Sequence, residues 1–338
     1  FDSTDTFRTY LPKILRSYAL DAISNTPVGK PARTDEAEAS KLLDSILELD
    51  AKSFPAIGLG EDFRLDSPSL SGGALAWNGK VIHLAAFQTA LPEPKPGPGN
   101  DEDSTRPLVI RRGHILLRGG HGRLALLDTG SPVSIGRGSE YTIAGRSYNP
   151  STGMHSVLDA AGEHIGRRVE WLFGHDFFAD NRVLIDWRSR VARILSPSAV
   201  ISDGLSIPIE LVMGVPVVRG RSGTKRISAV IDSGASLSYV PADVVEGLTP
   251  VGKRKDFYPG FGEFETDVWR IRADIGGRRL LINAGILPPM LQMMFGMILG
   301  SDGWIVGSDF FRNRTIIVDY PRGRLVDVTA HERPAYIE

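Results

Sequence analysis

An internal repeat constrains this chain more than any other feature. The first copy contains the segment LALLDTGSPVS (124–134), and the second contains SAVIDSGASLS (228–238). Each segment has an apolar run, an Asp, a small hydroxyl residue and a Gly, and each has a Ser four residues after the Gly. Self-similarity of this kind indicates a duplicated structural unit.

A second pair of matching segments follows the first in both copies. These segments are WLFGHDFFADNRVLIDW (171–187) and WIVGSDFFRNRTIIVDY (304–320). They share a Trp, two apolar residues, a Gly, the triplet Asp-Phe-Phe and, twelve residues after the Gly, an Asp followed by an aromatic residue. The copies differ in the distance between their two segments, because Gly174 lies 46 residues after Asp128 and Gly307 lies 75 residues after Asp232.

From about residue 106 onward the chain has the texture of a β protein. Short apolar runs such as 124–127 alternate with glycine-containing turns, and the same texture returns from residue 207. Many short strands separated by turn signals predict a mainly-β barrel or sandwich.

These residues carry a resemblance. Asp-Thr-Gly and Asp-Ser-Gly, each after an apolar strand and each followed by two apolar residues and Gly, resemble the signature of pepsin-like and retropepsin-like aspartic proteases. One isolated Asp-Ser-Gly is more often an ordinary turn, but here the whole pattern occurs twice and in order. Short lobes and the absence of cysteine make the chain look more like two retropepsin protomers fused in one chain. The resemblance covers about residues 106–330.

The resemblance implies a fold and an activity. We expect a two-lobed, retropepsin-like β-barrel fold with lobes at 106–200 and 201–338, and an aspartic endopeptidase that acts on peptide or protein substrates. Asp128 and Asp232 would be the catalytic pair. Two carboxylates that share one proton can activate a water and protonate the leaving nitrogen, and close like charges drive their two pKa values apart.

The residues around the pair would hold it in place. Glycine lets the backbone turn sharply, and the hydroxyl residues are expected to donate hydrogen bonds across the lobe interface. The segments 172–174 and 305–307 resemble the strand that passes beside each catalytic loop. The expected support residues are Thr129, Gly130, Ser131, Ser134, Ser233, Gly234, Ala235 and Ser238. The duplicated acids Asp176, Asp186, Asp309 and Asp319 are interpreted as structural groups that cap or pair with Arg182, Arg190, Arg314 and Arg324.

Two stretches compete for the role of a flap over the substrate. One is 141–155, with Tyr148 beside an Asn-Pro turn, and the other is 257–264, with Tyr258 and Phe261. Ordinary surface turns would look the same. Residues 285–300, rich in methionine, would form a loop and short helix that line a specificity pocket, a subunit interface or a lobe core.

Residues 1–105 precede the repeat and have a different pattern. Residues 7–23 and 36–49 show helical periodicity, and Asn78-Gly79 within 73–87 predicts a β-hairpin. Residues 91–107 are rich in Pro, Gly and acids and predict a linker. The region would be a pro-segment, a docking module or an extension of the first lobe's sheet.

Composition excludes several other functions. A net charge of −1 gives no reason to expect a nucleic-acid partner, and the absence of cysteine removes thiol chemistry and disulfides. The seven histidines show no metal-ligand spacing, so we expect neither a metal nor an organic cofactor. One chain supplies both Asp residues, so a monomer suffices, although a homodimer stays open. The rival hypothesis is a protein of the same fold that binds peptides without cutting them. The compartment is open, and the start at Phe1 slightly favours export if a leader has been removed.

Overall fold

The computed structural model describes residues 69–71, 74–77, 80–83, 88–89, 91–92, 104–138, 141–143, 146–148, 155–196, 199–201, 204–258, 262–299 and 302–331. The chain divides into two compact units. One contains residues 1–90 with 260–262, and the other contains residues 91–259 and 263–338. Each unit is described by itself.

A small antiparallel sheet of three strands is described in the first unit. It consists of β1 (Ser69–Ser71), β2 (Ala74–Trp77) and β3 (Lys80–His83), and a short strand β4 (Gln88–Thr89) follows. Trp77 pairs with Lys80, which leaves two residues for the turn and confirms the hairpin predicted there. The helices expected at 7–23 and 36–49 lie outside the described residues, as does most of the expected linker.

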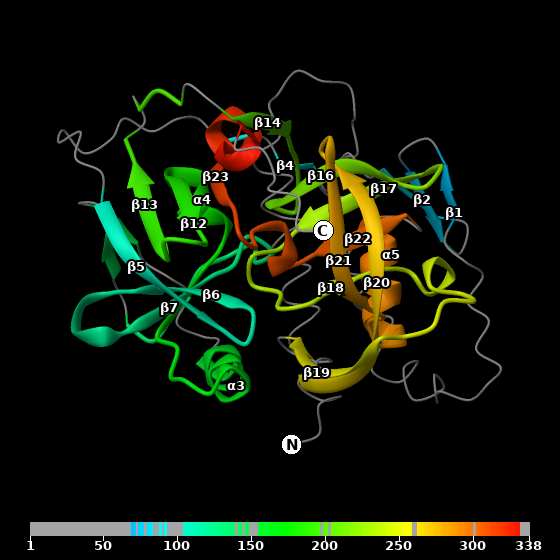
Figure 1. The fold of residues 1–338 in the computed structure, drawn as a ribbon, viewed down its shortest axis with the longest axis horizontal. Helices are drawn as coiled ribbons and strands as arrows, with labels where there is room; N and C mark the ends of the chain where they lie inside the picture. The colour runs from blue at the N-terminus through cyan, green and yellow to red at the C-terminus, as the bar shows by residue number, and fades with distance from the viewer. Residues whose placement is uncertain are drawn as a thin grey trace. The chain divides into compact units, whose positions relative to one another are not determined.

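The second unit is mainly β, as predicted, and is built on two mixed sheets (Figure 1). The first sheet has the strand order β14-β24-β23-β12-β13-β5-β6-β7-β11-β8. Its strands are β5 (Ser104–Arg111), β6 (His114–Arg118), β7 (Leu124–Leu127), β8 (Ile135–Gly136), β11 (Trp171–Phe173), β12 (Arg182–Asp186), β13 (Val191–Leu195), β14 (Leu205–Pro208), β23 (Thr315–Asp319) and β24 (Arg324–Asp327).

The second sheet has the order β19-β20-β21-β18-β22-β17-β16-β15 within this unit. Its strands are β15 (Glu210–Val212), β16 (Val215–Ser222), β17 (Lys225–Ile231), β18 (Ser238–Tyr239), β19 (Gly252–Tyr258), β20 (Gly262–Ile275), β21 (Arg278–Gly285) and β22 (Gly303–Val306). A separate hairpin pairs β9 (Tyr141–Ile143) with β10 (Arg146–Tyr148). The helices are α3 (His155–Ile165), α4 (His175–Asp180) and α5 (Pro289–Leu299), with short 3-10 turns η2 (Gly120–Gly122), η3 (Ala242–Val244), η4 (Ser308–Phe310), η5 (Tyr320–Arg322) and η6 (Val328–His331).

One boundary differs from the sequence-based expectation. The expected linker at 91–107 ends earlier, because β5 begins at Ser104 and its residues 104–107 pair with β13. Residues 285–300 contain a loop and a helix as expected, because α5 (Pro289–Leu299) follows the end of β21 at Gly285.

The repeat folds in the same way in both halves of this unit. Strand β7 pairs in parallel with β11, and β8 pairs antiparallel with the same β11. Strands β17, β22 and β18 repeat this arrangement. Strand β7 and the last five residues of β17 are fully buried, which explains their continuous apolar runs.

The two halves join through one antiparallel pair, β12 with β23. Leu184 pairs with Ile317, which occupies the equivalent position of the repeat, and Val183 and Ile185 pair with Val318 and Ile316. A residue that pairs with its own counterpart marks an approximate two-fold axis. The duplicated segments therefore form the seam between the halves.

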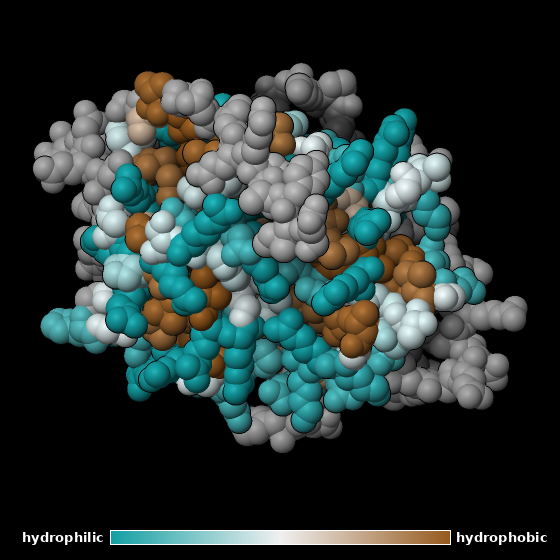
Figure 2. All heavy atoms as spheres, in the orientation of Figure 1, coloured by the Kyte–Doolittle hydropathy of each residue, from teal (hydrophilic) through white to brown (hydrophobic). Residues whose placement is uncertain are grey.

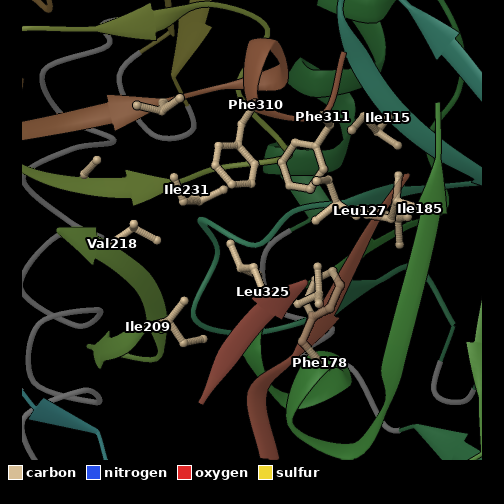
Figure 3. Close-up of a cluster of buried hydrophobic side chains, with 14 of the residues drawn as sticks. Ile115, Leu127, Phe178, Ile185, Ile209, Val218, Ile231, Phe310, Phe311 and Leu325 are labelled. Atoms are coloured by element: carbon tan, nitrogen blue, oxygen red, sulfur yellow. The ribbon is translucent and has the colours of Figure 1, made fainter. Parts of the chain in front are cut away.

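One hydrophobic core extends through both halves. The duplicated Asp-Phe-Phe triplets place four fully buried rings in it, Phe177, Phe178, Phe310 and Phe311. Figure 3 shows Phe310 and Phe311 beside Leu127 and Ile231, the last residues of β7 and β17. Burying rings of this size is a large apolar contribution to stability, and it fixes the strand ends that carry the two Asp residues.

Hydrophilic side chains cover much of the face shown in Figure 2, and hydrophobic ones appear there in separate groups. Among the described residues, no helix is both long and apolar enough to cross a bilayer.

Candidate active site

Asp128 and Asp232 directly follow the two equivalent strands β7 and β17. The backbone N–H of Asp128 donates to the carbonyl of Phe173 at 3.0 Å, and that of Asp232 donates to the carbonyl of Val306 at 2.9 Å. Each Asp is thus fixed by the strand that the sequence placed beside it. The same register in both halves brings the two loops together.

Thr129 and Ser233 bind each other's loop reciprocally. The Thr129 N–H donates to Ser233 Oγ at 3.0 Å, and the Ser233 N–H donates to Thr129 Oγ1 at 2.9 Å. Each hydroxyl also donates across the interface, from Thr129 to the Ile231 carbonyl (2.6 Å) and from Ser233 to the Leu127 carbonyl (2.8 Å). Both side chains are fully buried, so these four bonds replace all contact with water.

Gly130 and Gly234 allow the carboxylates to approach the opposite loop. A Cβ on Gly130 would lie 2.3 Å from Cγ of Asp232, and a Cβ on Gly234 would lie 2.4 Å from Cγ of Asp128. No side chain fits at either position. The motif therefore needs glycine because each loop packs against the other loop's carboxylate.

The two carboxyl groups lie close together, each against the glycine of the opposite loop. Asp128 is only 9% exposed, and Asp232 is partly exposed. Burial raises the pKa of Asp128 well above its usual value, and the neighbouring Asp232 charge raises it further. Burial also raises the pKa of Asp232, although its bonds from Asp128 and from the N–H groups of Gly234 (2.8 Å) and Ala235 (3.1 Å) oppose this. Burial thus favours the protonated form of both groups, and because the two groups interact, their titration belongs to the pair.

The remaining support residues lie where the loops meet the neighbouring strands. Ser134 Oγ accepts the Gly174 N–H at 3.0 Å, and Ser238 Oγ accepts the Gly307 N–H at 3.2 Å. Ser131 and Ala235 accept through their carbonyls from the N–H groups of residues 175 and 308, at 2.8 and 2.9 Å. Ser131 Oγ donates to the Val133 carbonyl at 2.8 Å.

The two candidate flap hairpins have different surroundings. Tyr258, at the end of β19, has its pKa raised by burial and by the charges of Asp232 and Asp128. Its ring makes an edge contact with Phe295 of α5, with centroids 5.8 Å apart. Tyr148 is instead buried, packs on Phe177 and accepts a hydrogen bond from Asn181, so we do not extend the flap proposal to it. Phe261 lies outside the described residues.

The duplicated acids make structural contacts, although not all with the expected arginines. Asp319 is fully buried and contacts Arg182 (3.3 Å) and Arg324 (3.4 Å). Asp309 pairs with Arg312 instead of Arg314, which lies 3.8 Å from Asp327. Asp176 accepts from the N–H and hydroxyl of Ser134, and Asp186 accepts from the N–H of Ser189.

Sequence reasoning missed two features beside the pair. Tyr320 is fully buried and donates its hydroxyl to the Thr129 carbonyl at 3.3 Å. His114, His164 and Asp256 form a buried cluster in which one potential ligand atom of each lies within 4.8 Å of the others, the one such group among the residues that the structure describes. Tyr320 had a signal, as the aromatic residue closing the second copy. The cluster had none, because its members are far apart in the sequence.

Comparison with known proteins gives limited matches. Residues 1–87 match a family model described as the ARG and Rhodanese-Phosphatase-superfamily-associated Protein domain. This match stops before β5 and says nothing of the site. No curated protein matches the chain.

The solved structures with detectable similarity include viral proteases. A solution structure of simian foamy virus (mac) protease is 18% identical and matches over 27% of this chain and 86% of that chain, with a TM-score of 0.21. A foamy viral protease–reverse transcriptase bound to an RNA/DNA hybrid is 12% identical over 28% of this chain and 11% of that chain, with a TM-score of 0.22. The chain thus spans a small part of the latter protein. Similarity this weak carries no argument about function.

Proposed function

We propose that this protein is an aspartic endopeptidase with a two-lobed, retropepsin-like arrangement, in which Asp128 and Asp232 form the catalytic pair. The observation that carries the proposal is the packing of each carboxyl group against the glycine of the opposite loop, which brings the two acids together. Neighbouring acids with raised pKa values are typical of acid–base sites.

The chemistry follows from one shared proton. The ionised carboxylate takes a proton from a water, whose oxygen attacks the scissile carbonyl carbon, while the protonated carboxyl gives its proton to the carbonyl oxygen. The tetrahedral intermediate then collapses: one of its hydroxyl groups returns a proton to the pair, the C–N bond breaks, and the nitrogen takes a proton from the pair. The products leave the pair with one proton again, so no metal or cofactor is needed for the cycle.

The surroundings of the pair favour an extended peptide as substrate. The hairpin of β19 and β20 presents backbone that can pair with a peptide strand. The rings of Tyr258 and Phe295 contact each other, and the charges of the Asp pair act on Tyr258, so these rings would suit an apolar side chain next to the cleaved bond. Both carboxyl groups come from one chain, so a monomer is sufficient for this reaction.

The test is cleavage of a diverse peptide library between about pH 3 and pH 8, read by mass spectrometry. Wild type is compared with Asp128→Asn and Asp232→Asn, which keep the shape and remove one shared carboxylate. We expect each substitution to lower the rate by at least about 10²-fold, the lower end of the range for acid–base catalysis. Asp186→Asn is the matched control, because Asp186 is a duplicated acid outside the pair.

Two outcomes would count against the proposal. Cleavage that survives both substitutions would mean that other residues catalyse it. Peptide binding without turnover, measured on the same library by affinity capture, would favour the rival hypothesis of a protein that holds peptides without cutting them.

A further inference from the structure

The cluster of His114, His164 and Asp256 lies where three elements meet. His114 begins β6, His164 is in the last turn of α3, and Asp256 is in the middle of β19. Helix α3 packs against β19, as Figure 1 shows. The side chains of His114, His164 and Asp256 are 5%, 7% and 2% exposed, so water does not satisfy them.

One atom of this cluster has no partner. Nδ1 of His114 lies 2.7 Å from the carbonyl oxygen of Gly234, which can only accept, so Nδ1 carries the hydrogen. Nε2 of the same ring then carries a free lone pair. This atom is buried and has no hydrogen-bond partner among the described residues.

His164 shows a related arrangement. Its Nδ1 lies 3.7 Å from Glu263 Oε1, and its Nε2 lies 3.4 Å from Asp256 Oδ1. The two rings meet edge to face, with centroids 5.4 Å apart. Nδ1 of His114 thus donates to a carbonyl, as in histidines that bind metals, whereas the carboxylate of Glu263 lies beyond hydrogen-bond distance from Nδ1 of His164.

We propose that His114, His164 and Asp256 bind one divalent ion of the zinc type. Two imidazole nitrogens and one carboxylate oxygen suit Zn²⁺ or a similar transition metal better than Mg²⁺ or Ca²⁺, which prefer oxygen ligands. Bonds of about 2.0–2.1 Å bring tetrahedral ligand atoms to roughly 3.3 Å from one another. The present spread of up to 4.8 Å closes to that value through small side-chain movements. A fourth position is left for water.

The ion would connect the hairpin of β19 and β20 to the loop that carries Asp232. Asp256 lies two residues before Tyr258, and Asp256 is already held by the Tyr239 hydroxyl at 2.6 Å and the Ser236 hydroxyl at 3.2 Å. His114 reaches the catalytic loop through the Gly234 carbonyl. A bound ion would therefore fix β19 to α3 and to the Asp232 loop. This proposal concerns binding and stands apart from peptidase activity.

The experiment is zinc titration of the full chain after removal of metals by chelation, followed by calorimetry and by thermal unfolding. We expect one Zn²⁺ per chain, a melting temperature raised by about 5 °C at 100-fold excess over Kd, and no equivalent effect of Mg²⁺. His114→Gln and His164→Gln should each weaken binding by at least about tenfold, because each removes a ligand.

Two controls separate this site from others. His175→Gln removes another largely buried histidine with Nδ1 bonded to a backbone carbonyl, Gly214 at 2.8 Å, and should leave binding unchanged. The double variant Asp128→Asn, Asp232→Asn should also bind zinc as wild type does, whether or not the protein cleaves peptides. Zinc lost in this double variant but kept in His164→Gln would place the ion on the Asp pair and overturn the proposal.

A surface variant allows the proposal to be tested even if the histidine variants do not fold. Glu263 is 61% exposed, so Glu263→Gln should fold normally. This substitution removes the negative charge near Nδ1 of His164 and should weaken zinc binding by roughly tenfold. No stoichiometric binding to wild type, or affinity equal in wild type, Glu263→Gln and any folded histidine variant, would overturn the proposal.

Discussion

The two halves of the second unit agree closely at the Asp loops and differ in what surrounds them. Around Asp128 and Asp232 the same backbone bonds, hydroxyl contacts and glycine contacts occur in each half. In the first half the hairpin that follows is short, from Tyr141 to Tyr148, and Tyr148 is buried in the core. In the second half the hairpin of β19 and β20 extends from Gly252 to Ile275 and carries Tyr258 near the pair.

This difference accounts for the unequal spacing of the repeat. The longer interval of the second half is used by the long strands β20 and β21 and by helix α5. The loops cannot diverge, because each is packed against the other and a change in one displaces both. The hairpins and helices that follow the loops are not packed against their counterparts in this way, so they can differ between the halves. Symmetry is therefore kept at the pair and lost in the hairpins that follow it.

The strictest test of symmetry at the loops is to fill the space that each glycine leaves. Gly130→Ala places a Cβ 2.3 Å from Asp232 Cγ, and Gly234→Ala places one 2.4 Å from Asp128 Cγ. Each carboxyl must move by about 1 Å, which lowers kcat/KM by at least about 10²-fold. Peptide cleavage kinetics on the folded variants measures the loss.

The matched control is Gly252→Ala, where a Cβ meets nothing within 4 Å. It should leave kcat/KM unchanged. A large loss in only one of the two loop variants would break the symmetry that the contacts indicate.

The next test concerns the reciprocal hydroxyl contacts. Thr129→Ala leaves the Ser233 N–H and the Ile231 carbonyl without partners, and Ser233→Ala does the same to the Thr129 N–H and the Leu127 carbonyl. Each should lower the free energy of unfolding by about 1–3 kcal/mol. Thr129→Ser keeps the hydroxyl and should lower the free energy of unfolding by less than Thr129→Ala does.

Urea unfolding measures these losses, together with that of the double variant. The two hydroxyls make separate bonds within one network between the same two loops, so the loops can adjust once one hydroxyl is lost, and the double variant should be less destabilised than the sum of the single ones. Strict additivity would mean that the two contacts act independently.

The site could be read from the sequence where local residues determine the geometry. The loops, their glycines and the strands beside them follow from motifs of a few residues, and the structure places them together as the repeat predicts. The seam between β12 and β23 involves the same duplicated segments, but nothing in either segment indicates that it pairs with the other.

The remaining features of the site could not be predicted, because they depend on contacts between distant parts of the chain. Tyr148 and Tyr258 both lie next to turn residues, and only Phe177 and Asn181 decide that Tyr148 belongs to the core. The cluster of His114, His164 and Asp256 joins residues 50 and 92 positions apart, so no spacing rule detects it. Asp309 contacts Arg312, three residues later in the chain, whereas the sequence analysis expected Arg314 among the partners of the duplicated acids.

The difference between the two hairpins predicts different losses for the two tyrosines. Tyr258→Ala removes the ring contact with Phe295 beside the pair and should lower kcat/KM by about tenfold, the upper value for one aromatic pair. Tyr148→Phe removes a hydroxyl that Asn181 contacts and should lower the free energy of unfolding by about 1 kcal/mol with unchanged kinetics. The reverse pattern, measured by kinetics and urea unfolding, would exchange the roles of the hairpins.

The smallest expected effect is a dependence of stability on pH. Burial raises the pKa of both Asp128 and Asp232 in the folded protein, so the folded state binds protons more strongly than the unfolded state. The stability that this binding contributes is fully present below the ordinary value of 3.8 and is lost as pH rises through the raised pKa values. Asp128→Asn removes one of the two buried charges. It should therefore unfold at a higher temperature than wild type at pH 8 and should show little difference at pH 4.

Thermal unfolding of both proteins across this range measures the effect, and Asp186→Asn provides the comparison with an acid outside the pair. The difference in unfolding temperature between Asp128→Asn and wild type must grow with pH, because the substitution stabilises the protein only where the wild-type pair is ionised. A constant difference would mean that the substitution acts through packing. A difference that shrinks with rising pH would mean that the buried pair is stabilised in its charged form, which the proposed shared proton does not allow.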